Sequence, residues 1–365
     1  NILNQQPVAG TNPEYRTVHS DTDTSRNVYS YGITSALEVR KWDATGNLLF
    51  HKSIALPLND DVTPSSARYF DAGDGRQLMQ LMLSSGYPDY SPSQMLVLID
   101  ENGEQLAELA VDADARVIAA SPQRALVQQN NQLVLLALPD LNPLHTITHA
   151  ELGGGTASSQ IKGVATPDNQ FKLLVAQADQ GATPSSHANE RVVLVTLGSG
   201  GEIIANLPWS GNQSYARFDI EDGSLSQFPL AHMVALNSGD IAVVEPCRSE
   251  EGCDSNSANV VVTSGDGVIR WQKQVNLPSS LPLVHASNSG TFIRLPQRAD
   301  VLMSPVGLRH AQGKLWLLAS SFSDGSGSET LQSLSQLWSF DSDSGQSQRH
   351  FSTFKQLLDY TVADD

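Results

Sequence analysis

A strand–turn–strand pattern recurs along this chain and constrains its fold more than any other feature. In residues 260–275, "VVVTSGDGVIRWQKQV", a β-branched run leads into a tight turn at Gly265, Asp266 and Gly267, and a second alternating run follows. Such a turn between two β-prone runs is typical of a β-hairpin. The pattern occurs at 36–54, 94–111, 132–149, 191–209, 260–275 and 335–353. The sequence therefore predicts a series of hairpins of similar design.

A second turn of the same chemistry precedes five of these hairpins. These turns lie at 71–76, 121–124, 167–170, 237–240 and 310–314, each between apolar or β-branched runs. The interval between the two turns is regular, because Gly75 to Gly103 and Gly239 to Gly267 both span 28 residues. The repeating unit is therefore four strands, named a to d, with short a–b and c–d turns.

Repeated four-stranded units with almost no helical periodicity predict an all-β chain with the β-propeller fold. We expect six four-stranded blades in one domain over residues 1–365. The predicted blades are 15–54, 66–111, 115–149, 160–209, 228–275 and 303–353, with 354–365 as a C-terminal closing segment that is either a strand or a short helix. Seven blades are the alternative, if 276–302 or the two termini together contain a further one.

The turns also carry a family resemblance. "WDATGNLLF" (42–50) and, more loosely, "SGDGVIRW" (264–271) follow a D-x-x-G-x-x-x-[WF] pattern. This pattern resembles the repeats of quinoprotein-type propellers and of the bacterial outer-membrane-assembly propeller lipoprotein. Those families usually carry eight blades and repeat the Trp regularly, whereas here the position is filled only by Phe50 and Trp271. The resemblance implies a bacterial propeller in which Trp271 packs between blades; the ligands of a quinone pocket have no counterpart here.

Charge and hydropathy exclude two classes of partner. The chain has 39 acidic and 22 basic residues, a formal net charge of -17, and no Lys/Arg cluster. Nucleic-acid binding needs a basic surface that displaces counterions from phosphates, so we expect no nucleic-acid partner. No apolar stretch approaches the roughly 20 residues that span a bilayer, so we expect no transmembrane segment.

The two cysteines bear on the cellular compartment. Cys247 and Cys253 lie close together in "EPCRSEEGCDSNS", without further Cys or His at the spacing of a zinc site. We predict a local disulfide and therefore an oxidising compartment; two free thiols in a cytosolic protein are the alternative. The chain begins at Asn1, which fits an exported protein that has lost a signal or lipoprotein anchor, or simply a shortened chain. We expect an exported protein, periplasmic, anchored to the outer membrane or extracellular.

Long connections gather at one end of the predicted blades. Alternate connections of an antiparallel sheet emerge at opposite ends, and here the a–b and c–d turns are uniformly tight. The long b–c connections are 84–94, 179–190, 246–258 and 322–335, and the long d–a connections are 55–66, 210–228 and 276–302. Long loops on a rigid scaffold concentrate binding residues, so this end is the predicted functional face.

The long connections carry aromatic and charged side chains of the kind that anchor recognition surfaces. The candidate ligand- or partner-binding residues are Tyr87, Asp89, Tyr90, Trp209, Tyr215, Arg217, Arg248, His285 and Arg294. For each of them the alternative is that the side chain packs its loop onto the blades.

The sequence carries no local signature of common catalytic machinery, such as G-x-S-x-G, H-E-x-x-H, a P-loop or a dinucleotide fingerprint. "SDTDTS" (20–25) and "DSDSG" (341–345) begin like calcium loops, but the Glu expected at loop position twelve is replaced by Gly32 and Ser352. We interpret these carboxylates as solvated turn residues and expect neither a metal site nor a cofactor, with calcium as the one alternative.

Two functions remain open at this point. The first is a monomeric binding or assembly module whose partner is a protein or a carbohydrate. The second is a hydrolase or lyase whose site is assembled from several blades at the central channel, since such a site leaves no local motif. An enzyme should bring two or more titratable groups within hydrogen-bond reach, whereas a binding module should present a broad polar and aromatic surface.

Overall fold

The computed structural model describes residues 18–22, 28–33, 36–43, 45–56, 62–85, 92–130, 132–152, 161–177, 191–210, 232–246, 254, 256–286, 292–300, 302–322, 329–331 and 334–353. These residues form strands and turns, without a helix among them. Their contacts divide the chain into two compact units, Asn1–Thr146 and Ile147–Asp365.

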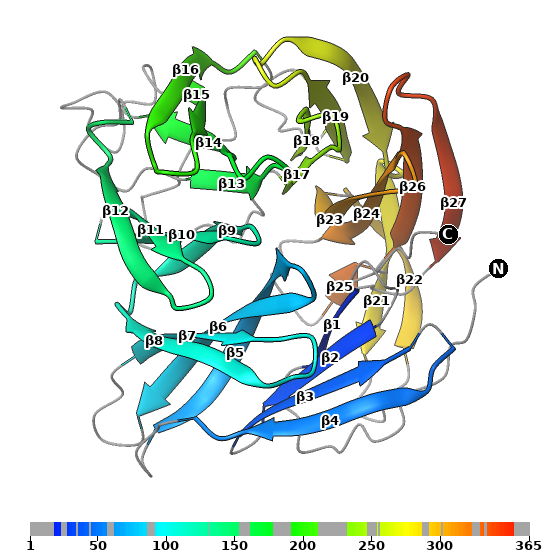
Figure 1. Ribbon diagram of the computed structural model, residues 1–365. Coiled ribbons are helices and arrows are strands. Elements are labelled where there is room, and N and C mark those ends of the chain that lie inside the picture. Colours follow the sequence, from blue (N-terminus) through cyan, green and yellow to red (C-terminus); the bar gives the residue numbers. More distant parts are fainter. Residues whose placement is uncertain are drawn as a thin grey trace. The chain divides into compact units, whose positions relative to one another are not determined.

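The first unit contains three four-stranded antiparallel sheets, of which the last strand ends just beyond the unit's border (Figure 1). The first sheet comprises β1 (Val18–Thr22), β2 (Val28–Ile33), β3 (Leu37–Trp42) and β4 (Leu48–Ile54). The second comprises β5 (Val62–Gly73), β6 (Arg76–Ser85), β7 (Pro92–Ile99) and β8 (Gln105–Val111). The third comprises β9 (Arg116–Ala120), β10 (Arg124–Gln129), β11 (Gln132–Ala137) and β12 (Asn142–Thr148).

The second unit contains three more four-stranded antiparallel sheets. They comprise β13 (Ile161–Ala165), β14 (Phe171–Gln177), β15 (Arg191–Leu197) and β16 (Ile203–Pro208); β17 (His232–Ala235), β18 (Ile241–Pro246), β19 (Ser257–Thr263) and β20 (Ile269–Asn276); and β23 (Leu302–Ala311), β24 (Lys314–Phe322), β26 (Ser335–Asp341) and β27 (Ser347–Thr353). The prediction of six four-stranded antiparallel sheets is therefore confirmed, and each sheet has the strand order of its sequence.

A seventh sheet corrects one detail of the sequence analysis. Residues 276–302 were expected to be a long connection, but they contain β21 (Ser280–Ala286) and β22 (Phe292–Asp300). β21 also pairs with β25 (Glu329–Leu331), which lies in the connection between β24 and β26. The resulting sheet has three strands in the order β22-β21-β25 (Figure 1).

Burial explains the sequence pattern of each strand. The central strand β19 is buried at nearly every position because sheets pack on both of its faces, so its sequence is a continuous apolar run. The outer strand β8 alternates exposed and half-buried positions, since only one of its faces meets a neighbouring sheet. In β7, Val97 packs toward the β1–β4 sheet, whereas Leu96 packs toward the β9–β12 sheet.

The tight turns are held by their own side chains. Asp43 Oδ1 accepts hydrogen bonds from the backbone N–H groups of Thr45 and Asn47, and Gly46 adopts φ of 89° between them. The side-chain hydrogen bonds from Asn47 and Thr45, together with these backbone bonds, lower the pKa of Asp43 to about 2. The carboxylate of such a turn is therefore ionised over the whole physiological pH range.

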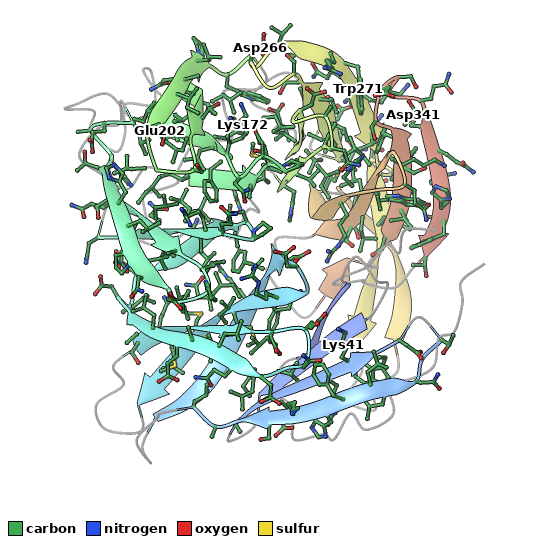
Figure 2. The ribbon with its side chains drawn as sticks, in the orientation of Figure 1. Lys41, Lys172, Glu202, Asp266, Trp271 and Asp341 are labelled. Carbon is green, nitrogen blue, oxygen red and sulfur yellow. The ribbon has the colours of Figure 1, made fainter. Side chains whose placement is uncertain are left out.

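Side chains of one sheet also reach the c–d turn of the next. Lys41 Nζ donates to the Glu101 carbonyl at 3.0 Å, and Trp271 Nε1 donates to the Ser342 carbonyl at 2.8 Å. Trp271, labelled in Figure 2 on the β17–β20 sheet, also stacks on Phe340, with ring centroids 6.2 Å apart. The expectation that Trp271 packs between sheets is confirmed.

Candidate functional surface

The connections between strands differ in length at the two ends of the sheets. At one end, short turns join the strands, as at 74–75, 100–104, 166–170, 198–202, 236–240, 264–268 and 342–346. At the other end the second unit has longer connections, at 149–160, 178–190, 209–231, 247–256, 277–301 and 323–334, whereas the first unit also has short ones there, at 34–36, 112–115 and 130–131. We call these the tight-turn end and the long-connection end. The asymmetry expected from the sequence is therefore clear in the second unit, where every connection at the long-connection end is longer than the tight turns.

In the first unit, two glutamines fix the short segment 112–115 at the long-connection end. Gln80 and Gln94 are almost fully buried and hydrogen-bonded to each other. Gln94 Nε2 donates to the Ala113 carbonyl at 2.6 Å, and Gln80 Nε2 donates to the Ala115 carbonyl at the same distance. Each glutamine therefore ties the β5–β8 sheet to the segment between β8 and β9.

In the second unit, buried polar side chains do the same. The Asn256 amide donates to the Leu277 carbonyl, so the base of the 247–256 connection is joined to the segment after β20. Near β26, the Leu334 backbone N–H donates to Ser321 Oγ at 2.7 Å, and Ser320 shares a hydrogen bond with Ser335. Because buried polar groups are costly when unpaired, these bonds hold the bases of the connections in defined positions.

Trp209 is the one candidate residue whose side chain the structure describes. It directly follows β16, is 2% exposed, and packs in the core between the β13–β16 and β17–β20 sheets. Its Nε1 donates to Glu245 Oε1 at 2.8 Å, and Glu245 is fully buried at the end of β18. The side chain of Trp209 therefore packs onto the sheets instead of being exposed for a ligand, and it anchors the base of the 209–231 connection.

His285 and Arg294 lie on strands rather than on a loop. His285 is paired with Ile293 on β22 and with Glu329 on β25, and Arg294 is paired with Val284. The three-stranded sheet that contains them is built from two connections of the long-connection end, 277–301 and 323–334. It does not separate its neighbours, since the β17–β20 and β23–β27 sheets share one core.

The remaining candidates lie outside the described residues. They are Tyr87, Asp89, Tyr90, Tyr215, Arg217, Cys247, Arg248 and Cys253. All of them belong to segments that connect described strands at the long-connection end, in the first unit at 86–91 and in the second at 209–231 and 247–256.

A cavity of about 340 Å³ lies in the first unit, between the β5–β8 and β9–β12 sheets. Its walls are mainly apolar, with Leu109, Val127 and Leu136 among the lining side chains. Asp112 and Gln129 also line it, and both lie where strands end at the long-connection end. This volume falls at the lower end of the range usual for small-molecule sites.

Sequence reasoning missed two arginines in the first unit. Arg68 on β5 and Arg116 at the start of β9 lie on neighbouring edge strands, close enough for their charges to interact. Arg116 is half-buried, and burial, followed by the charge of Arg68, lowers the pKa of its guanidinium. The signal available in the sequence was that the first strands of two consecutive four-stranded repeats each carry an arginine, in a chain that is acidic overall.

The described residues also bear on metals and membranes. Within these ranges, no three His, Cys, Asp or Glu side chains gather as metal ligands would. Asp341 of the second calcium-like segment instead accepts the backbone N–H of Ser344 at 2.8 Å, as a turn residue does. None of the described segments is an apolar helix of membrane-spanning length.

Comparison with known proteins gives matches among solved structures alone: neither a protein-family model nor a curated protein matches the chain. Sqt1 of Saccharomyces cerevisiae matches at 10% identity and a TM-score of 0.43, over 93% of this chain and 75% of that one. A subtype N10 neuraminidase-like protein of A/little yellow-shouldered bat/Guatemala/060/2010 matches at 10% identity and a TM-score of 0.43, over 90% of this chain and 98% of that one. The WD40 domain of SCAP from fission yeast matches at 9% identity and a TM-score of 0.38, over 96% of this chain and 79% of that one.

Proposed function

We propose that the chain is an exported β-propeller that acts as a binding or assembly module through its long-connection end. In this proposal the six four-stranded sheets are the blades of one closed, monomeric disc. Closure would cover the sheet edges that open arrays leave available for aggregation. The direct packing of the β17–β20 sheet on the β23–β27 sheet supports six blades rather than seven, because the three-stranded sheet is not inserted between them.

The observation that carries the proposal is the unequal length of connections at the two ends of the sheets. Ordering a loop costs conformational entropy at each fixed residue, so stability alone favours short connections. Here the longest connections are kept at one end. Buried Asn256 and Trp209 fix the bases of two of them, and Gln80 and Gln94 hold the 112–115 segment at the same end of the sheets in the first unit. A scaffold that holds long loops at rigid bases is suited to recognition.

The tight-turn end offers a rival surface that any test must include. Several large apolar side chains are exposed near the start of outer strands, among them Leu48 and Leu49 at 53%, Ile204 at 54% and Val268 at 63%. They provide matched control positions, since they are exposed and lie away from the long connections.

Site-specific photo-crosslinking in the source cell tests the proposal. A benzophenone amino acid would be placed at Tyr87, Tyr215 or Arg248, and in control chains at Leu49, Ile204 or Val268. We expect a discrete crosslinked product from the first group, lost when Tyr90 or Arg217 is replaced by Ala in the same chain. Products from the control positions alone, or from neither group, would overturn the proposed surface.

A further inference from the structure

Arg68 and Arg116 form an unusual pair of charges for this chain. Among the residues that the structure describes, neither guanidinium has an ion-pair or hydrogen-bond partner, although the net charge of the chain is -17. The carboxylates nearest in sequence have other partners: near Arg116, Asp112 accepts from the Asn130 side chain at 2.5 Å and Asp114 from the Asn130 backbone N–H at 3.1 Å, and near Arg68, Asp71 accepts from the Gly73 backbone N–H at 2.7 Å. The described part of the chain therefore provides no carboxylate partner for either of these two cations.

The positions of the two arginines are fixed by Gln80. On β6, Gln80 is the cross-strand partner of Arg68. Its side chain bonds the main chain on both sides of Arg116, because it donates to the Ala115 carbonyl at 2.6 Å and accepts from the Val117 N–H at 3.0 Å. Gln80 is 3% exposed, so these bonds are shielded from water. One buried amide thus holds the strand that carries Arg116 beside the strand that carries Arg68.

This arrangement is unfavourable without a ligand. Like charges repel, and a half-buried guanidinium loses part of its hydration without gaining a partner. An oxyanion would remove both costs, since guanidinium groups bind carboxylate, sulfate and phosphate oxygens through charge-assisted, often bidentate hydrogen bonds. Arg116 is also the first residue of β9, directly after the segment 112–115, and so lies at the long-connection end.

We infer that Arg68 and Arg116 bind an oxyanion group of the ligand, so that the partner of this surface carries a carboxylate, sulfate or phosphate. The inference rests on the proposed binding function and names the chemical class of its ligand. It also explains how a strongly acidic protein takes an anionic partner: the local pair of cations opposes the repulsion of the overall charge.

The test measures thermal unfolding and calorimetric binding of the full chain with inorganic phosphate, sodium sulfate or sodium acetate, each against chloride at the same ionic strength. Binding to the native state raises Tm in proportion to the logarithm of ligand concentration above Kd. We expect at least one anion to raise Tm, and the order of the three to identify the preferred group. In Arg68→Gln and Arg116→Gln, the affinity for that anion should fall at least tenfold.

Arg349→Gln is the matched control, because Arg349 is an exposed arginine of the second unit that lies over the Trp338 ring. It should keep the wild-type response. In chloride alone, Arg68→Gln should melt at the wild-type temperature or higher, whereas an arginine with only a structural role would lower Tm when replaced. Arg68 is exposed, so this variant is expected to fold.

The outcomes separate this inference from the proposed function. An anion response that is absent, or that is equal in wild type and both variants, overturns the oxyanion site even if crosslinking from Tyr87 and Tyr215 succeeds. Conversely, loss of crosslinking together with an arginine-dependent anion response would overturn the proposed partner surface while leaving the anion site in place.

Discussion

Lys172 donates a hydrogen bond from Nζ to the carbonyl oxygen of Gly265 at 2.8 Å, although the two residues are 93 positions apart and belong to different sheets. The same ammonium donates to Thr196 Oγ1 at 2.9 Å within its own sheet. Figure 2 labels Lys172 beside the turn that contains Asp266. In the first unit, Lys41 bonds the Glu101 carbonyl in an equivalent way. A buried lysine therefore joins a sheet to the c–d turn of the next sheet in each unit.

Replacing Lys172 by Met should lower the free energy of unfolding by about 1–3 kcal/mol, because the Gly265 carbonyl and Thr196 hydroxyl lose their buried partner while the aliphatic stem is kept. Urea denaturation would measure the loss. Lys273→Met is the control, since Lys273 is exposed, and it should stay within about 0.5 kcal/mol of wild type. Equal effects of the two substitutions would show that the bond between sheets contributes nothing.

Gly345→Ala should be more destabilising than Gly313→Ala. Both glycines have positive φ, 69° and 66°, so both variants pay about 1–2 kcal/mol for a left-handed backbone. A Cβ at Gly313 would meet nothing within 4 Å, but at Gly345 it would lie 2.8 Å from Trp271 Cδ2. We expect a further loss of about 1–3 kcal/mol from this clash.

A double-mutant cycle checks the cause of that difference. Trp271→Leu should remove the extra cost of Gly345→Ala but leave the cost of Gly313→Ala unchanged, because residues in contact couple and distant ones add. If both alanine variants lose the same stability, the packing of Trp271 beneath this turn is not a source of specificity between sheets.

The four-stranded sheets could be predicted because their signals are local. Gly239 and Gly267 have φ of 80° and 83°, a conformation that few other residues adopt, so the glycines in the sequence mark where the turns lie. The three-stranded sheet could not be predicted in the same way. β25 has three residues, and its pairing of Thr330 with Val284 joins two separate connections. Pro296 lies within β22, and because proline cannot donate a backbone hydrogen bond, its presence argues against a strand there.

The candidate surface was predictable only as a region. Connection lengths reveal which end carries long loops, but not which side chains turn inward. Trp209 sits beside a loop in the sequence, and only the fold brings Glu245, 36 positions later, to its indole N–H. Arg68 and Arg116 became significant only because the packing of two sheets brings β5 and β9 into contact, so that the two charges interact. Contacts of this kind depend on tertiary packing rather than on local pattern.

Cys247 and Cys253 lie outside the described residues, and their disulfide stays a prediction. We expect no free thiol in the denatured, unreduced protein when it is titrated with a thiol reagent. Reduction should lower the free energy of unfolding by about 2 kcal/mol at most, because the closed loop is small. A Cys247→Ser, Cys253→Ser double variant should then show no response to reductant. Two titratable thiols in protein purified without reductant would contradict both the bond and the exported location.

His149 should make the protein sensitive to mild acid. Its side chain is buried, with 5% exposed, and neither ring nitrogen has a hydrogen-bond partner. Burial lowers its pKa below the ordinary 6.5, so the folded state keeps the ring neutral where the unfolded state takes up a proton. The contribution of neutral His149 is therefore complete above pH 6.5 and is lost as the pH falls toward its folded pKa.

Chemical denaturation at a series of pH values below 7 tests this expectation. The free energy of unfolding should fall by up to about 1.4 kcal/mol per pH unit from this one group. His149→Leu should remove that part of the slope, because leucine fills a similar apolar space and does not titrate. His145→Gln is the control, since His145 is exposed, and it should keep the wild-type slope. If the His149→Leu curve stays parallel to the wild-type curve between pH 7 and 5, protonation of this buried ring does not govern acid stability.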